Sequence, residues 1–144
     1  MPYRYRGDIA VADIAFDAWG ETLEEVFAGA AQATMQVMVE DLATIRPLQP
    51  VRVELEQQDP EMLLFDFLND LVFYKDASRL FLLPYELEIT GGGEDGCALR
   101  CVLRGETIDE GRHRPKTDVK AVTLHRFSLS RTPEGWRATV VLDV

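Results

Sequence analysis

Cysteine, basic residues and long apolar runs are all scarce in this 144-residue sequence, and each shortage excludes a class of protein. Two cysteines, Cys97 and Cys101, are too few for the disulfide framework of a small secreted domain. On an extended strand they would lie about 13 Å apart, too far for a disulfide between them. No apolar run approaches the ~18 residues needed to span a bilayer, and the N-terminus lacks the apolar core of a secretion signal. We therefore expect a cytoplasmic protein without a membrane partner.

The shortage of basic residues also bears on partners, because 15 basic residues against 25 acidic ones give a formal net charge of −10. Such a charge repels a polyphosphate chain and removes most of the free energy gained by counterion release. Direct binding to nucleic acid is therefore not expected. The same charge suits a basic protein partner or a divalent cation, although in most proteins it only improves solubility.

What the sequence does contain is the composition of an ordinary globular protein, with 47% hydrophobic and 28% charged residues. A chain of this length buries most of its unfolded surface in one core. No internal repeat, linker or low-complexity tract divides it. We therefore expect residues 1–144 to form a single domain.

The first elements predicted along the chain are a strand and a helix. Polar and apolar residues alternate over Ala12–Trp19, which is typical of a strand with one buried side. Thr22 and Glu25 then form a capping box, in which side chains satisfy the first free amides of a helix. Apolar residues recur at helical spacing after this box, and the predicted helix covers residues 22–42.

A second strand and helix follow. Val51–Glu56 alternates between apolar and charged residues, as a strand does. Asp59 is suited to cap the next helix and Pro60 to occupy its first turn. The apolar stripe of this helix is broad enough to indicate burial on most sides, and we expect the helix to end near Ser78.

The rest of the chain predicts strands joined by short turns, which favour antiparallel hairpins. We therefore predict an α+β fold, in which an antiparallel sheet, either single or folded into two layers, packs against two helices. The four expected strands are Leu80–Ile89, Ala98–Ile108, Val119–Ser130 and Trp136–Val144.

Standard catalytic signatures are missing, since the sequence contains no HExxH, GxSxG or CxxC motif. The glycine cluster at residues 91–93 precedes a strand rather than a helix, so we interpret it as a hairpin turn and not as a phosphate cradle. His113 lies among basic residues in a polar loop, which we expect to be solvated. His125 alternates with apolar residues on the predicted inner face of its strand, so its first interpretation is a hydrogen-bonded core histidine.

Asp13 and Asp143 are the best candidates for a metal site. Each lies in a predicted strand among mostly apolar residues, where an isolated carboxylate would cost several kcal/mol to desolvate. If their two strands lie side by side, the carboxylates converge. Together with backbone carbonyls and water, they would suit a hard cation such as calcium or magnesium. The alternative is that both aspartates end their strands in water.

Several segments, taken in order, resemble the archease family over nearly the whole chain. They are Ala12-Asp13-Ile14 followed by Gly20, Thr22 to Phe27, Leu63 to Leu71, Gly105-Glu106, Val119 to His125 and Leu142-Asp143-Val144. Each segment alone is a weak match, whereas their order and spacing together are specific. The sequence departs from the family pattern at Ala10-Val11, where the family usually has His-Thr.

The resemblance implies an accessory protein, not an enzyme, that activates an RtcB-type RNA ligase in tRNA splicing and RNA repair. It implies that the guanylated histidine belongs to the ligase and that the accessory protein promotes guanylylation and turnover through a metal-binding aspartate site. Asp13 and Asp143 match the two motif aspartates, and the expected metal is calcium, with magnesium or manganese as alternatives. Lys120 matches the lysine of the family's Val-Lys-Ala segment, and we expect Lys120 and His125 to contact the ligase.

Two other functions are compatible with the same residues. One is a chaperone-like modulator of other RNA-modifying enzymes, a role also proposed for archease-like proteins. The other is a metal-dependent hydrolase that uses Asp13 and Asp143. A hydrolase needs a general base and a substrate pocket, and the sequence offers no clear base apart from His125.

Overall fold

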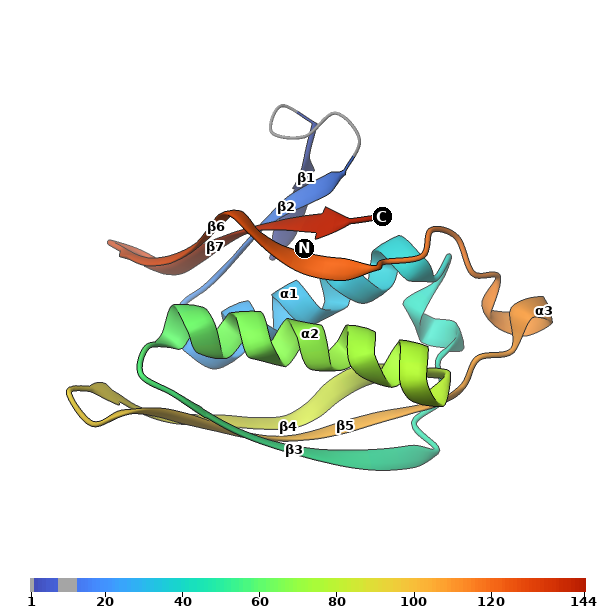
Figure 1. Ribbon diagram of the computed structural model, residues 1–144, viewed down its shortest axis with the longest axis horizontal. Coiled ribbons are helices and arrows are strands. Elements are labelled where there is room, and N and C mark those ends of the chain that lie inside the picture. The colour runs from blue at the N-terminus through green and yellow to red at the C-terminus, as the bar shows by residue number, and fades with distance from the viewer. Residues whose placement is uncertain (1, 8–12) are drawn as a thin grey trace.

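The computed structural model describes residues 2–7 and 13–144, which form two antiparallel sheets with two long helices between them (Figure 1). The four-stranded sheet has the order β1 (Tyr3–Arg6), β2 (Ile14–Gly20), β7 (Gly135–Asp143), β6 (Ala121–Thr132). The three-stranded sheet has the order β3 (Gln49–Gln57), β5 (Gly96–Thr107), β4 (Leu80–Gly93). The helices are α1 (Leu23–Met38), a short 3-10 helix (Leu42–Thr44), α2 (Pro60–Ser78) and α3 (Glu110–His113). The predicted α+β class is confirmed, and the helices fill the space between the two layers.

Helix α1 begins where the capping box predicts. The backbone N–H of Glu25 donates to Thr22 Oγ1 over 3.2 Å, and the Glu25 carboxylate accepts the backbone N–H of Glu21 over 2.8 Å. The helix ends at Met38, earlier than expected, because Val39 is extended and forms an isolated bridge with Pro115. Tertiary pairing therefore ended a helix that the apolar spacing alone would continue.

Helix α2 has the bounds that the sequence predicts. Asp59 caps it by accepting the backbone N–H of Met62 over 2.9 Å, and Pro60 occupies its first turn. Arg79 closes its C-terminal end in the left-handed conformation, with φ 53°. Both faces of α2 are covered, since the helix contacts β3 and β4 of one sheet and β6 of the other. This position explains its broad apolar stripe.

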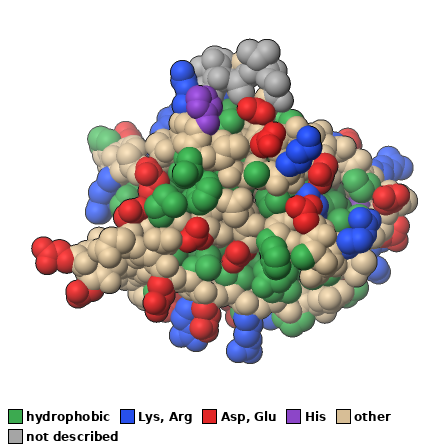
Figure 2. Space-filling model, in the orientation of Figure 1, with side chains coloured by type: hydrophobic (Ala, Val, Ile, Leu, Met, Phe, Trp, Pro, Cys, Tyr) green, Lys and Arg blue, Asp and Glu red, His purple; other side chains and the backbone are tan. Residues whose placement is uncertain are grey.

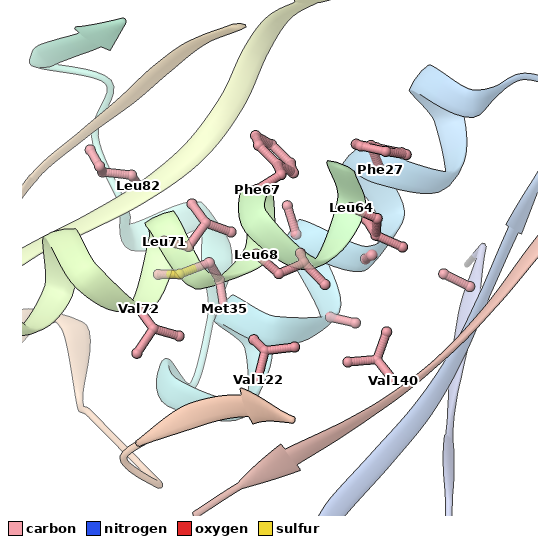
Figure 3. Packing of buried hydrophobic residues seen from close by; sticks show 14 of the residues in the cluster. Phe27, Met35, Leu64, Phe67, Leu68, Leu71, Val72, Leu82, Val122 and Val140 are labelled. Atoms are coloured by element: carbon pink, nitrogen blue, oxygen red, sulfur yellow. The ribbon is translucent and has the colours of Figure 1, made fainter. Parts of the chain in front are cut away.

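The hydrophobic core lies between the two sheets (Figure 3). Phe27 of α1 and Phe67 of α2 meet at its centre, with ring centroids 5.8 Å apart and both side chains fully buried. Leu82 lines the same core from the three-stranded sheet, and Val122 and Val140 line it from the four-stranded sheet. One layer of helices thus covers the inner faces of both sheets.

The surface is rich in charged side chains, as the 28% of charged residues in the sequence indicates. Acidic and basic side chains are interspersed on the face shown in Figure 2 and do not form one patch. This arrangement is typical of a well-solvated surface. Within the described ranges, no helix is long and apolar enough to cross a membrane.

Candidate functional site

Asp13 and Asp143 lie at the same edge of the four-stranded sheet. Strand β2 pairs antiparallel with β7, and the register ends with Ile14 opposite Leu142. The residues that follow outward are Asp13, just before β2, and Asp143, the last residue of β7. The expected condition, that the strands of the two aspartates lie side by side, is therefore met.

Both aspartates are exposed, so the expectation that each carboxylate is desolvated among apolar residues was wrong. Water hydrates carboxylates at the ends of strands, and neither Asp13 nor Asp143 needs a buried partner to offset desolvation. The alternative interpretation, two aspartates that end their strands in water, describes their surroundings correctly. Hydrated carboxylates on adjacent strands are nevertheless the oxygen ligands that calcium and magnesium prefer.

Lys120 lies at the same edge, on the other side of Asp143. Its backbone N–H donates to the carbonyl oxygen of Asp143 over 2.8 Å, and the next residue, Ala121, lies opposite Asp143 in the sheet. The Lys120 side chain is exposed. The fold thus gathers Asp13, Asp143 and Lys120 from distant parts of the sequence at one edge.

His125 lies at an irregularity in β6. Regular pairing with β7 stops after Thr123 and resumes at Ser128, and within this stretch Arg126 adopts a left-handed conformation with φ 52°. The irregularity leaves Leu124 60% exposed and also exposes His125. The interpretation of His125 as a core histidine was therefore wrong, because strict alternation along the strand ends where the pairing breaks.

His113 is the buried histidine, contrary to the expectation of a solvated loop. Its Nδ1 accepts the backbone N–H of Asp109 over 2.8 Å, and its Nε2 lies 3.0 Å from a carboxylate oxygen of Glu106. Arg112 and Arg46 also bind the buried Glu106 carboxylate. Burial alone would raise the pKa of Glu106, but these hydrogen bonds outweigh it and hold the pKa well below its usual range. Arg46 and Arg112 therefore neutralise a carboxylate inside the protein.

Asp17 is a second buried carboxylate, which sequence reasoning missed. The alternation over Ala12–Trp19 predicts one buried side, and Asp17 lies on the side opposite to the core residue Phe16, yet it is 0% exposed. Thr139, Arg6 and Arg137 donate to it over 2.7, 3.0 and 2.8 Å, and Arg4 Nε lies 3.6 Å away. Burial by itself raises the pKa of Asp17, and these donors lower it below its ordinary value. In the sequence, the buried position of Asp17 is signalled by two arginines at alternate positions, Arg4 and Arg6. This signal can be interpreted only once β1 is known to pair with β2.

A divalent cation suits the donor chemistry of Asp13 and Asp143, because calcium takes about six to eight oxygen ligands. Among residues 2–7 and 13–144, no group of three or more His, Cys, Asp and Glu side chains could hold an ion. Asp13 and Asp143 are thus the two carboxylates that the described residues would offer to such an ion. Ala10 and Val11, which replace the family's His-Thr, lie outside the described residues.

The sequence matches the model of the Archease protein family (MTH1598/TM1083) over residues 3–144. It is 36% identical to protein archease of Thermococcus gammatolerans over 134 residues, which cover 92% of this chain and 93% of the relative. It is also 36% identical to protein archease of Pyrococcus furiosus over 135 residues, with coverage of 92% and 93%. The archease of Methanothermobacter thermautotrophicus is 35% identical over 133 residues, again with coverage of 92% and 93%.

Solved structures show the same fold. The solution structure of Methanobacterium thermoautotrophicum protein 1598 aligns with a TM-score of 0.83 at 33% sequence identity and covers 99% of each chain. A crystal structure from Thermotoga maritima, described as an archease and possible chaperone, aligns with a TM-score of 0.65 and covers 96% of each chain. At 20% identity, the second likeness shows the fold alone.

Proposed function

The chain belongs to the archease family, and on that premise we propose that it is an accessory protein that activates an RtcB-type RNA ligase. In this proposal it promotes guanylylation of the ligase's own histidine and repeated turnover, in tRNA splicing or RNA repair. The observation that supports the proposal is the pairing of β2 with β7, which brings Asp13 and Asp143 to one edge of the sheet. These are the two aspartates that match the family motif.

In this proposal, Asp13 and Asp143 hold a divalent cation, with calcium expected first and magnesium or manganese as alternatives. When bound, the cation supplies a hard Lewis-acidic centre at the surface. The protein's own contribution is positional. Asp143 ends the central strand β7 directly after Leu142, which pairs with Ile14 of β2, and its carbonyl oxygen accepts the backbone N–H of Lys120. The Asp143 carboxylate therefore projects from the end of a paired strand and not from a free loop.

Lys120 and His125 are the proposed contacts to the ligase. Both side chains are exposed, and they lie on the segment that leads into β6 and on its irregularity. A net charge of −10 favours approach to a basic surface of the partner, because complementary charge speeds association. The proposed contact surface thus combines hydrated carboxylates with an exposed lysine and histidine.

Single-turnover guanylylation of the cognate ligase, with this protein in limiting amount, tests the proposal. Asp13→Asn and Asp143→Asn keep the side-chain size and remove the charge, so each is expected to lower stimulation about tenfold or more. Asp95→Asn, at an exposed position in the β4–β5 turn, is the matched control and should stimulate like the wild type. Absence of stimulation by the wild type, or full stimulation by Asp13→Asn, contradicts the proposal.

Two further assays separate the alternatives. A chaperone-like modulator would recover several unrelated RNA-modifying enzymes in a pull-down, whereas an activator of one ligase would recover that ligase. A hydrolase that uses Asp13 and Asp143 would turn over phosphoesters with magnesium or manganese. Failure to turn over a broad panel of phosphoesters would remove the hydrolase.

A further inference from the structure

We propose that the outer face of the four-stranded sheet binds a nucleoside monophosphate at a site formed by Arg4, Arg137 and Trp19. The site lies along β1, β2 and β7 and uses none of the residues assigned to ligase activation. It follows from three observations, which are the strand register, two exposed arginines beside one buried carboxylate, and a pocket that opens beside them.

The register places the three side chains on one face. Trp19 lies opposite Arg137, and Arg4 lies opposite Asp17, two residues before Trp19 in the same strand. Directly opposed residues of antiparallel strands project to the same side of the sheet. Phe16 and its alternate neighbours point into the core, so these residues lie on the face turned away from the helices.

Arg4 and Arg137 both approach the buried Asp17 carboxylate and keep a large part of their side chains exposed. Arg4, Arg6 and Arg137 all approach one carboxylate. The side chains of Arg4 and Arg137 are 63% and 45% exposed, whereas Asp17 is fully buried. Arg137 contacts Asp17 through Nη2, and a guanidinium has five N–H donors in a planar fork that matches phosphate oxygens. The buried carboxylate thus holds Arg137 in place, which reduces the entropy cost of binding an anion.

A pocket of about 820 Å³ opens beside these arginines. This volume falls within the range of about 300–1,000 Å³ that small-molecule sites occupy. Arg4 and Arg137 line the pocket together with Trp19 and Trp136. Trp19 is 39% exposed and offers a flat apolar surface, while Arg131 lies over the ring of Trp136 at 5.2 Å. A phosphate on the arginines would therefore leave its nucleoside beside an exposed indole, on which a base can stack.

Acidic side chains on the pocket wall restrict the size and charge of the ligand. Glu21, Glu25 and Glu134 also line the pocket, and the Glu25 carboxylate accepts the backbone N–H of Glu21. Carboxylates accept the amino and imino N–H groups of a base, but they repel additional phosphates. With a net charge of −10 on the whole chain, this wall favours one phosphate with one base over a nucleic-acid strand.

Isothermal titration calorimetry of the full chain at low salt, with AMP, GMP, CMP and UMP as ligands, tests the proposal. We expect at least one of them to bind with a Kd below about 1 mM and about tenfold more tightly than ribose 5-phosphate, which lacks the stacking base. Arg4→Gln and Trp19→Ala should each weaken binding about tenfold. Arg4→Gln leaves the short hydrogen bonds of Asp17 intact, so it tests binding without removing them.

Arg100→Gln, at an exposed position on β5 in the other sheet, is the matched control and should bind like the wild type. Thermal unfolding of each variant establishes that it is folded. The proposal is overturned if no nucleoside monophosphate binds, if inorganic phosphate binds as tightly as the nucleotides, or if Arg4→Gln binds normally. Binding of a 5′-phosphorylated oligonucleotide without binding of any mononucleotide also overturns it.

Discussion

At the scale of single residues, Asp17 and Glu106 are buried carboxylates held by arginines from different elements. Arg6 and Arg137 reach Asp17 from β1 and β7, and Arg46 and Arg112 reach Glu106. Burying an unpaired carboxylate costs several kcal/mol, which these charge-assisted hydrogen bonds offset. Both clusters therefore couple distant parts of the chain, and loss of either carboxylate would leave several donors without their acceptor.

Glu106→Gln is expected to destabilise the protein by about 2–3 kcal/mol at pH 7, because it removes the charge that Arg46, Arg112 and His113 share. The pKa of Glu106 is lower in the folded state than its unfolded value of about 4.3, so its stabilisation is complete above about pH 5. The stabilisation is lost as the pH falls below the unfolded pKa. Urea unfolding at pH 7 and pH 3 measures the difference between variant and wild type.

The exposed Glu54→Gln on β3 is the control and should leave the free energy of unfolding nearly unchanged at both pH values. A destabilisation by Glu106→Gln that is equally large at pH 3 would contradict the lowered pKa of Glu106. At pH 3 the wild-type protein should already have lost part of the free energy of unfolding that the ionised carboxylate contributes.

At the scale of elements, the close approach of β4 and β5 depends on a single glycine. A Cβ atom added to Gly105 would lie 1.8 Å from the carbonyl oxygen of Phe81, which no side-chain rotation can relieve. Gly105 lies opposite Leu82 in the ladder and directly precedes the buried Glu106. The Gly105-Glu106 pair of the family resemblance thus has a structural basis in this protein.

Gly105→Ala is expected to cost more than about 3 kcal/mol or to prevent folding, because strand β5 must move away from β4. Gly93→Ala is the matched control, since a Cβ at that position meets no atom within 4 Å, and its effect should stay within about 0.5 kcal/mol. Thermal unfolding measures both variants. Similar unfolding temperatures for the two would show that the close approach at Gly105 is not required.

Strand β6 combines an edge position with an interrupted ladder. It is the last strand of its sheet, and its pairing with β7 fails between Thr123 and Ser128. Irregularities of this kind discourage a second chain from pairing with an exposed edge. The same irregularity exposes Leu124 and His125, so one feature of the backbone both protects the edge strand and leaves the proposed ligase contact His125 accessible.

At the scale of the whole molecule, two sheets enclose one helical layer, and the thiols of β5 are protected by that arrangement. Cys97 and Cys101 are free and buried, so the expectation that they form no disulfide is confirmed. Burial raises the pKa of both thiols, and that of Cys101 rises to about 12. Neither cysteine is therefore a reactive thiolate at neutral pH.

Labelling by a thiol reagent at pH 8 should accordingly be at least about a hundredfold slower for the folded protein than in urea above the unfolding midpoint. The reaction of both cysteines should follow the population of unfolded molecules as urea is raised. The labelling rates are measured from the absorbance of the thiolate that the reagent releases when it reacts with a cysteine. Rapid labelling of native protein would show that β5 opens locally, without unfolding of the core.

The sequence by itself determined the features that depend on neighbours along the chain. Thr22 and Asp59 mark the starts of both long helices, because a cap acts on amides two or three residues away. Alternation located the strands, and their short turns indicated antiparallel pairing. The order of its motifs also identified the family. Asp13 and Asp143 could be named as candidates from those motifs.

Only the tertiary structure decided which strands pair, and with that which side chains are buried. The pairing of β2 with β7 placed Asp13 and Asp143 at the same end of the sheet, and arginines of β1 and β7 buried Asp17. The fold also buried His113, which was expected in a solvated loop, and exposed His125, which was expected in the core. The physical reason is that burial on the outer face of a sheet depends on cross-strand neighbours, and an interrupted ladder ends the alternation from which a face is predicted.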